Sequence, residues 1–293
     1  MKLSTLKTIT NHPLTKDHKI RTLLRFLKRG IVIRLHSYPM LYPFLANTKL
    51  LVKKGMSSAE LQIYTGLFDF NEMFFVLHYL TPEDLFVDVG ANVGVYTVLA
   101  SGVKNAKSIA IEPDTDTFLN LQNNVNLNYI ADLVQLCNIG IGEKKGTVKF
   151  TKGLDAINHI QRTEDSSKDV VEIQIESLDD ILRNENPSII KIDVEGYETQ
   201  VIKGALETLK KQSLKAVIIE LNGLANKYNF NENSIHQTLI EHGFKPYAYM
   251  PFKRELILLE MHGDHNTIYL RDVDLIARKL NLSPKYKVLN KLV

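Results

Sequence analysis

Short apolar segments rich in Val and Ile alternate with segments of helical character from about residue 84 onward. Alternation of this kind is typical of crossover units, in which helices join neighbouring parallel strands and cover both faces of the sheet. The chain is therefore predicted to be an α/β protein with a mostly parallel sheet. The expected strands are 85–89, 107–111, 133–139, 188–192 and 215–220, and the expected helices are 94–101, 115–127, 198–211 and 232–242.

Further strands are expected outside this regular series. Between its third and fourth strands lie "GTVKF" and "VVEIQIE", the second with apolar and polar residues in alternation. The segments "KPYAYM" and "NTIYLR" predict a late strand pair, and the residues after Arg271 predict a surface helix with a frayed end. The expected divisions are a basic, partly helical N-terminal extension at 1–56, a main domain at 57–271 and a C-terminal tail at 272–293.

The net charge of +3 hides an uneven distribution. Residues 1–56 contain twelve Lys or Arg and one acid, Asp17, so this extension carries +11 and the rest of the chain −8. Such asymmetry indicates a separate role for the extension, in contact with an anionic membrane face, a phosphorylated carrier or nucleic acid.

The segment 18–29 is the amphipathic part of the extension. Its apolar residues share one helical face and its basic residues lie elsewhere. A helix at a membrane surface has this pattern, and so does a surface helix packed on its own domain, so both interpretations stay open. The apolar face consists of Ile20, Leu23, Leu24 and Leu27.

The composition also bears on the compartment. Cys137 is the only cysteine, which excludes an internal disulfide and favours a reducing environment. No apolar stretch reaches the length of about 18 residues that a membrane span needs, and the N-terminus lacks the apolar region of a secretion signal. A cytoplasmic protein is expected, with peripheral contact at the inner face of the membrane through residues 1–56 as an option.

The segment "DVGANVG" ends the first strand of the series on a turn that contains two glycines. Gly90 and Gly94 are spaced G-x-x-x-G, and Asn92 stands where the dinucleotide fingerprint G-x-G-x-x-G has its middle glycine. Asp88 would repel a phosphate but suits a ligand with positive charge, such as the sulfonium and amino groups of S-adenosylmethionine. The structural alternatives are close helix packing for the glycines and a helix cap for Asp88.

A second acid follows at the end of the next strand. Glu112 lies 18 residues beyond Gly94, close to the spacing at which dinucleotide-binding folds place the acid that accepts hydrogen bonds from ribose hydroxyls. Alone it could be an ordinary strand-end charge. Together, the two strand ends predict a nucleoside-containing cofactor.

Acidic residues gather again after the fourth strand, in "KIDVEGYE". Asp193, Glu195 and Glu198 fall within six residues, so a positive group is expected nearby: a lysine, a metal ion or the sulfonium of the cofactor. Lys191 is expected on the opposite side of the strand from Ile190 and Ile192, and a purely structural role for it stays open.

The fifth strand ends on Glu220, with Asn222 two residues further on. Asp193, Glu220 and Asn222 could together bind a hard cation such as Mg²⁺. Alternatively, Asp193 and Glu220 position a substrate hydroxyl and accept its proton, or the acids only cap helices and turns.

The segment "MHGDHNTIYL" places His262, Asp264 and His265 just before a strand. His265 is a candidate general base because histidine titrates near neutral pH. A polar loop is the alternative interpretation. A zinc site is not predicted, because no cysteine or second histidine pair accompanies the H-x-x-H spacing.

Taken together, these motifs resemble the FkbM family of S-adenosylmethionine-dependent methyltransferases. The similarity covers roughly residues 65–225 and leaves the basic extension outside. It includes "FNEMFFVLHYL", "FVDVGANVGVYT", "AIEPD", "CNIGIGE", "IESLDDIL", "IIKIDVEGYETQVIKGA" and "VIIELNG".

The resemblance implies a Rossmann-like class I methyltransferase fold, with a seven-stranded sheet whose last strand is antiparallel. It implies transfer of a methyl group to a hydroxyl, most typically of a sugar in a glycan or glycolipid. By position, Asp193 would lie closest to the transferred methyl, with Glu195 beside it. The cofactor residues would be Asp88, Gly90, Asn92, Gly94 and Glu112, with Asn138 next to the adenine.

Other functions remain open from the sequence. One is an enzyme that acts on amines, or on RNA bound by the extension. Amino-directed enzymes of this fold, however, often carry an N-P-P-Y-like turn where this chain has "DVEGY". Nucleic acid is not the expected partner. A non-catalytic module that docks on a membrane or protein is another. An oxidoreductase is disfavoured by the missing middle glycine.

Overall fold

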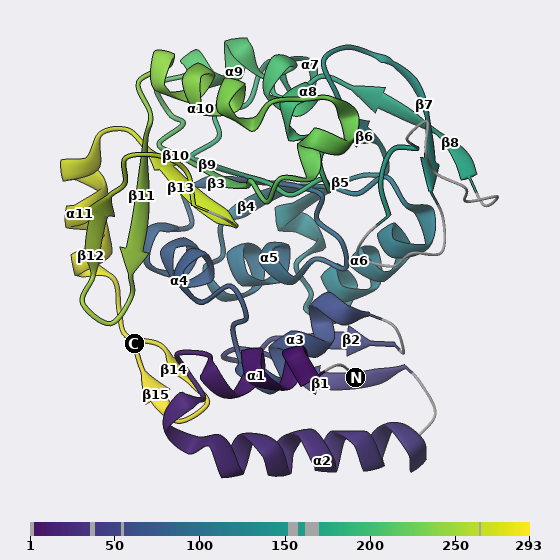
Figure 1. The fold of residues 1–293 in the computed structure, drawn as a ribbon, viewed down its shortest axis with the longest axis vertical. Helices are drawn as coiled ribbons and strands as arrows, with labels where there is room; N and C mark the ends of the chain where they lie inside the picture. The colour runs from purple at the N-terminus through teal and green to yellow at the C-terminus, as the bar shows by residue number, and fades with distance from the viewer. Residues whose placement is uncertain (1–2, 36–38, 54–55, 152–157, 162–169, 264) are drawn as a thin grey trace.

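The computed structural model describes residues 3–35, 39–53, 56–151, 158–161, 170–263 and 265–293 (Figure 1). Its centre is an eight-stranded sheet with the strand order β12-β11-β13-β10-β9-β3-β4-β5. Neighbouring strands from β5 to β10 are parallel, whereas β13 runs antiparallel to both β10 and β11. The strands are β3 (Leu85–Val89), β4 (Lys107–Ile111), β5 (Val134–Cys137), β9 (Ile189–Ile192), β10 (Ala216–Glu220), β11 (Lys245–Met250), β12 (Glu255–Leu258) and β13 (Asn266–Leu270).

This sheet confirms the predicted α/β class and its antiparallel last strand. The expected seven strands are present, and β12 adds an eighth at one edge by pairing with β11. Strand order reverses between β3 and β9, which places the carboxyl ends of β3, β4, β9 and β10 around one crevice. Ligands of open parallel sheets bind at such a switch point.

Helices cover both faces of the sheet, and alternate strand residues face each layer. In β3, Phe86 packs with the helices on one side and Val87 with those on the other. Figure 1 shows α4 to α6 on one side and α7 to α10 on the opposite side. The helices are α4 (Phe70–Tyr79), α5 (Val95–Thr97), α6 (Thr115–Leu127), α7 (Leu178–Ile181), α8 (Glu198–Lys203), α9 (Leu206–Lys210) and α10 (Glu232–Glu241).

Two of the predicted helices differ in detail. The helix expected at 94–101 begins as α5 and continues as the π-helical η2 (Val98–Val103). The helix expected at 198–211 is divided into α8 and α9 at Gly204, where a Cβ atom would lie 2.1 Å from the carbonyl oxygen of Gly142. This contact draws the loop after β6 against the break between the helices.

A second sheet, with the order β6-β8-β7, flanks the crevice. It confirms the two additional strands predicted between the third and fourth strands of the central series. Short 3₁₀ helices are η3 (Ala131–Leu133) and η5 (Leu224–Tyr228), and the strands are β6 (Gly140–Ile141), β7 (Gly146–Thr151) and β8 (Val170–Glu176).

The N-terminal residues pack on the main core. Leu14, Leu50 and Val52 are buried in the same cluster as α4, and the side chain of Asn124 in α6 accepts a hydrogen bond from the backbone of Leu51 at 2.6 Å. No helix in the described part of the chain is long and apolar enough to cross a membrane. The elements are α1 (Leu3–Asn11), η1 (Lys16–His18), α2 (Lys19–Leu35), β1 (Met40–Pro43), β2 (Lys49–Val52) and α3 (Ser57–Thr65).

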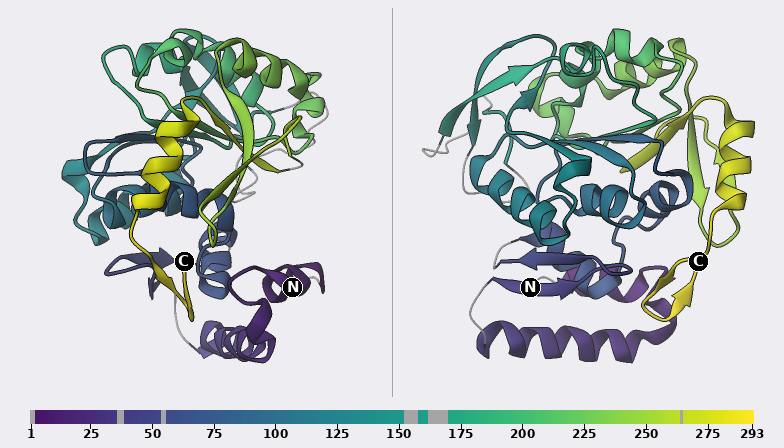
Figure 2. Two further views of the ribbon diagram at one scale, coloured as in Figure 1. Left: turned by 90° about the vertical axis from the view of Figure 1, so that its left-hand side faces the viewer. Right: turned by 180° about the vertical axis from the view of Figure 1, so that it is seen from behind.

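The C-terminal residues are ordered against this region, so the expected frayed end is wrong. After α11 (Val273–Leu282), the strands β14 (Lys287–Val288) and β15 (Lys291–Leu292) form a hairpin. Val288 and Val293 are buried in the main core, which gives the hairpin the apolar contacts a frayed end lacks. Figure 2 shows this hairpin beside the N-terminal helices.

Candidate active site

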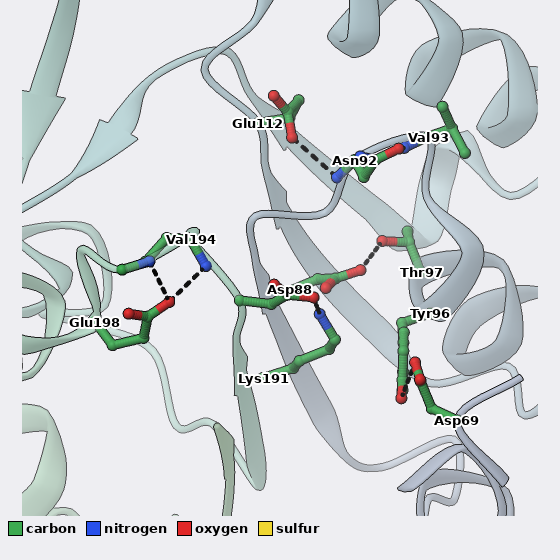
Figure 3. Close-up of polar contacts among 12 residues, drawn as sticks. Asp69, Asp88, Asn92, Val93, Tyr96, Thr97, Glu112, Lys191, Val194 and Glu198 are labelled. Carbon is green, nitrogen blue, oxygen red and sulfur yellow. Dashed lines mark hydrogen bonds and ion pairs between the residues drawn. The ribbon is translucent and has the colours of Figure 1, made fainter. Parts of the chain in front are cut away.

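A cavity of about 290 Å³ opens at the carboxyl ends of the central strands. One part is lined by the ends of β3 and β4, which supply Asp88 and Glu112, and another by the ends of β9 and β10, which supply Asp193 and Glu220. Residues from α3, α4 and the flanking sheet complete its wall. The structure therefore brings together the two groups of acids that the sequence predicts. Figure 3 shows Asp88 and Glu112 of the first group, with Lys191 nearby.

The two carboxylate oxygens of Asp88 differ in their hydrogen bonding. The Thr97 hydroxyl donates to Oδ2 at 2.7 Å, whereas Oδ1 is buried without a hydrogen-bond partner in the described structure. Burial raises the pKa of Asp88, although the charge of Lys191 opposes this shift. A buried, unsatisfied acceptor in a cavity wall fits a ligand that brings N–H donors or positive charge.

The two glycines of the turn each allow close contact with a different neighbouring element. Gly90 lines the cavity at φ +76°, and a Cβ there would lie 1.9 Å from the carbonyl oxygen of Asp193. Gly94, at φ +85°, packs against α6, where a Cβ would lie 2.5 Å from Leu121. Glycine is thus required at both positions by the protein itself, because the turn touches β9 on one side and α6 on the other.

Glu112 fastens this turn to the end of β4. Its Oε2 accepts from the backbone N–H of Asn92 and its Oε1 from that of Asp114, both at 2.9 Å. Burial raises the pKa of Glu112 to about 7. Both Glu112 and Asn92 line the cavity.

Asn138 is not among the residues that line the cavity, and its place next to the adenine stays a prediction. The residue is exposed, and its Nδ2 donates to the carbonyl oxygens of Glu112 and Pro113 at 2.8 and 3.1 Å. Ile139, the next residue, lines the cavity instead. Asn138 therefore braces the loop that carries Glu112.

Lys191 supplies the positive charge that the acidic cluster requires. Its ammonium lies 2.9 Å from Asp193 Oδ2 and 4.9 Å from the ring centroid of Tyr96, and the side chain is 4% exposed. Burial would lower the pKa of Lys191, but the charges of Asp193, Asp88 and Asp69 raise it overall. The lysine thus stays protonated among the three carboxyl groups.

Asp193 and Glu220 form a hydrogen-bonded pair with opposite pKa shifts. Burial would raise the pKa of Asp193, but the charge and hydrogen bond of Lys191 and the hydrogen bond with Glu220 lower it overall. Burial and the charge of Asp193 raise the pKa of Glu220 to about 8. At neutral pH the pair accordingly holds one proton on Glu220, while Asp193 is ionised.

The turn after β9 is fixed by a buried glutamate. Glu198 Oε1 accepts from the backbone N–H groups of Val194 and Gly196 at 3.1 and 3.2 Å. Glu195 adopts φ +56° within this turn and lines the cavity next to Asp193. Glu198 thus belongs to the support of the site, and Glu195 to its surface.

Asp69 and Tyr96 line the cavity beside Lys191 and were not predicted from the sequence. The Tyr96 hydroxyl donates to Asp69 Oδ2 at 3.1 Å, and burial raises the pKa of Asp69. Asp69 directly precedes the helix α4 and does not follow any predicted strand. A search for acids at strand ends therefore could not find it. A polar residue at the start of "DFNEMFFVLHYL" was the only local signal.

Two predicted residues lie away from the cavity wall. His265 is exposed, and the wall is formed by its neighbour Asn266. Asn222 is exposed as well, and its Oδ1 accepts from the backbone N–H of Leu224 at 3.0 Å. Asp264 lies outside the described residues.

The predicted metal ligands are only partly assembled. Carboxylate oxygens of Asp193, Glu195 and Glu220 lie within 4.8 Å of one another, so Glu195 takes the place expected for Asn222. Asp193 already pairs with Lys191, however, and Glu220 carries a proton at neutral pH. The negative charge of these carboxyl groups is thus already neutralised by Lys191 and by the proton on Glu220. The three residues therefore fit Mg²⁺ poorly.

The part of the cavity near β3 and β4 fits the cofactor that the resemblance implies. Asp88 offers its unsatisfied oxygen to a cationic amino group, and Glu112 offers carboxylate acceptors to hydroxyl groups. Asn92 and Ile139 complete this part of the wall. These residues would hold S-adenosylmethionine.

Comparisons with known proteins identify the family of the chain. The family model described as "Methyltransferase FkbM domain" matches residues 88–246, more than half of the chain. The chain is 29% identical over 143 residues to "Hexuronic acid methyltransferase AglP" of Haloferax volcanii, a match covering 48% of this chain and 56% of that protein. The match thus spans little more than half the length of this relative.

Two solved structures are similar at a lower level. A methyltransferase FkbM from Methylobacillus flagellatus has 17% sequence identity and a TM-score of 0.45, over 75% of this chain and 56% of that one. A precorrin-6y C5,15-methyltransferase from Geobacter metallireducens has 13% identity and a TM-score of 0.44, over 79% of this chain and 100% of that one. With the family-model match over residues 88–246, the chain belongs to the FkbM family of S-adenosylmethionine-dependent methyltransferases.

Proposed function

We propose that this protein transfers the methyl group of S-adenosylmethionine to a hydroxyl group of a sugar, in a glycan or a glycolipid. The observation that carries the proposal is the pair formed by Asp193 and Glu220 in the same cavity as Asp88 and Glu112. An ionised carboxylate next to a protonated one can accept a hydrogen bond from a hydroxyl and also donate one. The named activity of the Haloferax volcanii relative, on hexuronic acid, supports a sugar as the acceptor.

S-adenosylmethionine supplies a methyl group on a positively charged sulfur, which an attacking oxygen can displace in a single step. The protein must hold the hydroxyl in line with that methyl group, and alignment of this kind can contribute about 7–11 kcal/mol. Asp193 is suited to this task because the Lys191 ammonium holds its Oδ2 at 2.9 Å and a carboxylate oxygen of Glu220 lies within 4.8 Å. As the new C–O bond forms, the hydroxyl proton passes to Asp193.

Lys191 also bears on the role of a metal ion. Its ammonium neutralises the carboxylate that a cation would otherwise bind. We therefore expect turnover to continue in the presence of a chelator. A rate that falls with chelator and returns with added Mg²⁺ would contradict this part of the proposal.

The experiment uses envelope glycans from cells that lack this protein as the acceptor. Purified protein and isotopically labelled S-adenosylmethionine should add one labelled methyl group, located by mass spectrometry on a sugar oxygen. Label on RNA or on an amine would overturn the proposal.

Asp193→Asn removes the proton acceptor while keeping the size of the side chain. Turnover should fall by about 10²- to 10⁴-fold, the usual contribution of a general base. Calorimetry should show nearly unchanged binding of S-adenosylmethionine. Asp180→Asn, which changes an exposed carboxylate paired with Arg183, is the matched control and should keep full activity.

A further inference from the structure

The helix α2 presents an apolar stripe to solvent. Ile20, Leu24 and Leu27 are 77%, 60% and 59% exposed, and their spacing places them on one face of the helix. The sequence left open whether this face packs on the protein's own domain, and the structure shows that these three side chains do not.

The opposite face of α2 makes the contacts with the domain. The ring of Phe26 lies 5.4 Å from that of Tyr64 in α3, and Arg25 Nη1 donates to the Tyr64 carbonyl oxygen at 2.9 Å. Thr22 is buried on the same side. Figures 1 and 2 show α2 along one outer edge of the molecule, with the remaining elements on one side of it.

The stripe is bordered by positive charge. The acid of this extension, Asp17, is paired with Lys291 at 2.5 Å, so its negative charge is already balanced. The exposed basic residues around the stripe are Lys16, Lys19, Arg21 and Lys28.

We propose that α2 is a docking surface for an anionic lipid bilayer. The helix lies in the plane of the interface, with its apolar stripe at the boundary between headgroups and acyl chains and its lysines on the lipid phosphates. Charge complementarity selects this partner over a second copy of the chain, because two copies meeting through α2 would bring like charges together. The helix lies on the membrane and does not cross it.

The test is flotation of the full chain with phosphatidylcholine vesicles that either contain or lack phosphatidylglycerol. We expect binding to the anionic vesicles only, weakened by high salt because screening shortens the range of the charges. Failure to bind anionic vesicles at low salt, or equal binding to neutral ones, would overturn the proposal.

Two variants separate the contributions of the stripe and the charges. Replacing the three apolar residues by serine should weaken binding at least about tenfold, because apolar burial in the interface is lost. Replacing three lysines by glutamine should weaken it about 10²-fold, at about fivefold for each charge. The variants are Ile20→Ser/Leu24→Ser/Leu27→Ser and Lys16→Gln/Lys19→Gln/Lys28→Gln.

A matched control removes three exposed apolar side chains elsewhere, and it should bind like the unmodified chain. Equal loss of binding in the control would show that the stripe has no special role. A change from dimer to monomer in the stripe variant, measured by sedimentation, would assign the stripe to a second copy and overturn the proposal. The control is Ile257→Ser/Leu258→Ser/Leu282→Ser, at positions 47%, 56% and 87% exposed.

Folding is checked by calorimetric binding of S-adenosylmethionine to each variant. Should the stripe variant fail to fold, the lysine variant still decides the matter, since its side chains are exposed. Unchanged binding of the folded lysine variant to anionic vesicles would contradict the proposal.

Discussion

At the scale of single residues, Lys191 determines the charge state of the site. Its ammonium is buried between strand ends that carry Asp88 and Asp193, and its charge also reaches Asp69. The resulting environment keeps Asp193 ionised and leaves the proton of the acid pair on Glu220. A residue that looked structural in the sequence therefore sets the protonation state of the predicted base.

Lys191→Met keeps most of the volume of the side chain but removes its charge. The free energy of unfolding should fall by about 1–3 kcal/mol, because Asp193, whose side chain is 33% exposed, loses the ammonium that balances its charge. Urea denaturation measures the loss. In the double variant Lys191→Met/Asp193→Asn the loss should be smaller than the sum of the single losses, and additivity within about 0.5 kcal/mol would show that the two residues do not interact.

The raised pKa of Glu220 predicts a pH-dependent stability. The carboxyl group has a pKa of about 8 in the fold and 4.5 as its ordinary value, so the folded state holds more protons between these limits. Its contribution to stability is present below pH 4.5 and is lost as the pH rises through about 8. The melting temperature of the unmodified chain should therefore fall between pH 6 and 9 relative to that of Glu220→Gln, whose side chain cannot ionise. The same dependence of melting temperature on pH in both proteins would refute this.

At the scale of elements, the turn between β3 and α5 is held by contacts with β9, β4 and α6. Gly90 meets the backbone of Asp193, Asn92 bonds to Glu112, and Gly94 packs on Leu121. The glycines that the sequence connected with a ligand are thus also required by these neighbouring elements. The turn therefore couples the cofactor part of the cavity to the acidic part.

Gly90→Ala should destabilise the protein much more than the same substitution at a glycine that has a similar φ angle but no atoms near the added Cβ. The positive φ angle costs about 1–2 kcal/mol, and the clash with the Asp193 carbonyl adds about 1–3 kcal/mol. Gly243 is the control, because its φ is +83° and a Cβ there would meet nothing within 4 Å. Chemical denaturation compares the two variants, and equal losses would show that the contact with Asp193 is unimportant.

At the scale of the whole molecule, the two ends of the chain support each other. Arg21 donates to Asn290 at 3.1 Å, and Lys291 pairs with Asp17, so the hairpin of β14 and β15 holds the helix α2. The same hairpin inserts Val288 into the main core. The hairpin therefore links the N-terminal helices to the main core.

Removal of residues 285–293 should destabilise the protein and expose its N-terminal helices. Loss of the buried Val288 and Val293 alone corresponds to about 3–6 kcal/mol. Limited proteolysis should then cleave within residues 3–35 faster than in the full chain. Leu292→Ala, at a position that is 61% exposed, is the control and should change neither property.

Much of the fold could be predicted because the strands and glycine turns have local signatures. The strands at 85–89 and 107–111 and the helix at 115–127 coincide with β3, β4 and α6. The hairpin after residue 285 was missed, since its stability comes from contacts with residues that are distant in sequence, such as Arg21 and the core around Val288. The edge strand β12 was missed for the same reason, because it depends on pairing with β11.

The sequence by itself determined the order of strands and helices and the acids at the ends of four strands, because parallel strands bring their carboxyl ends to one edge. Only the tertiary structure decided which groups meet there. It placed Lys191 beside Asp193, brought in Asp69 from the position just before α4, and left Asn138, Asn222 and His265 out of the cavity wall. Side-chain direction and burial depend on packing between distant segments, and no local pattern in the chain encodes them.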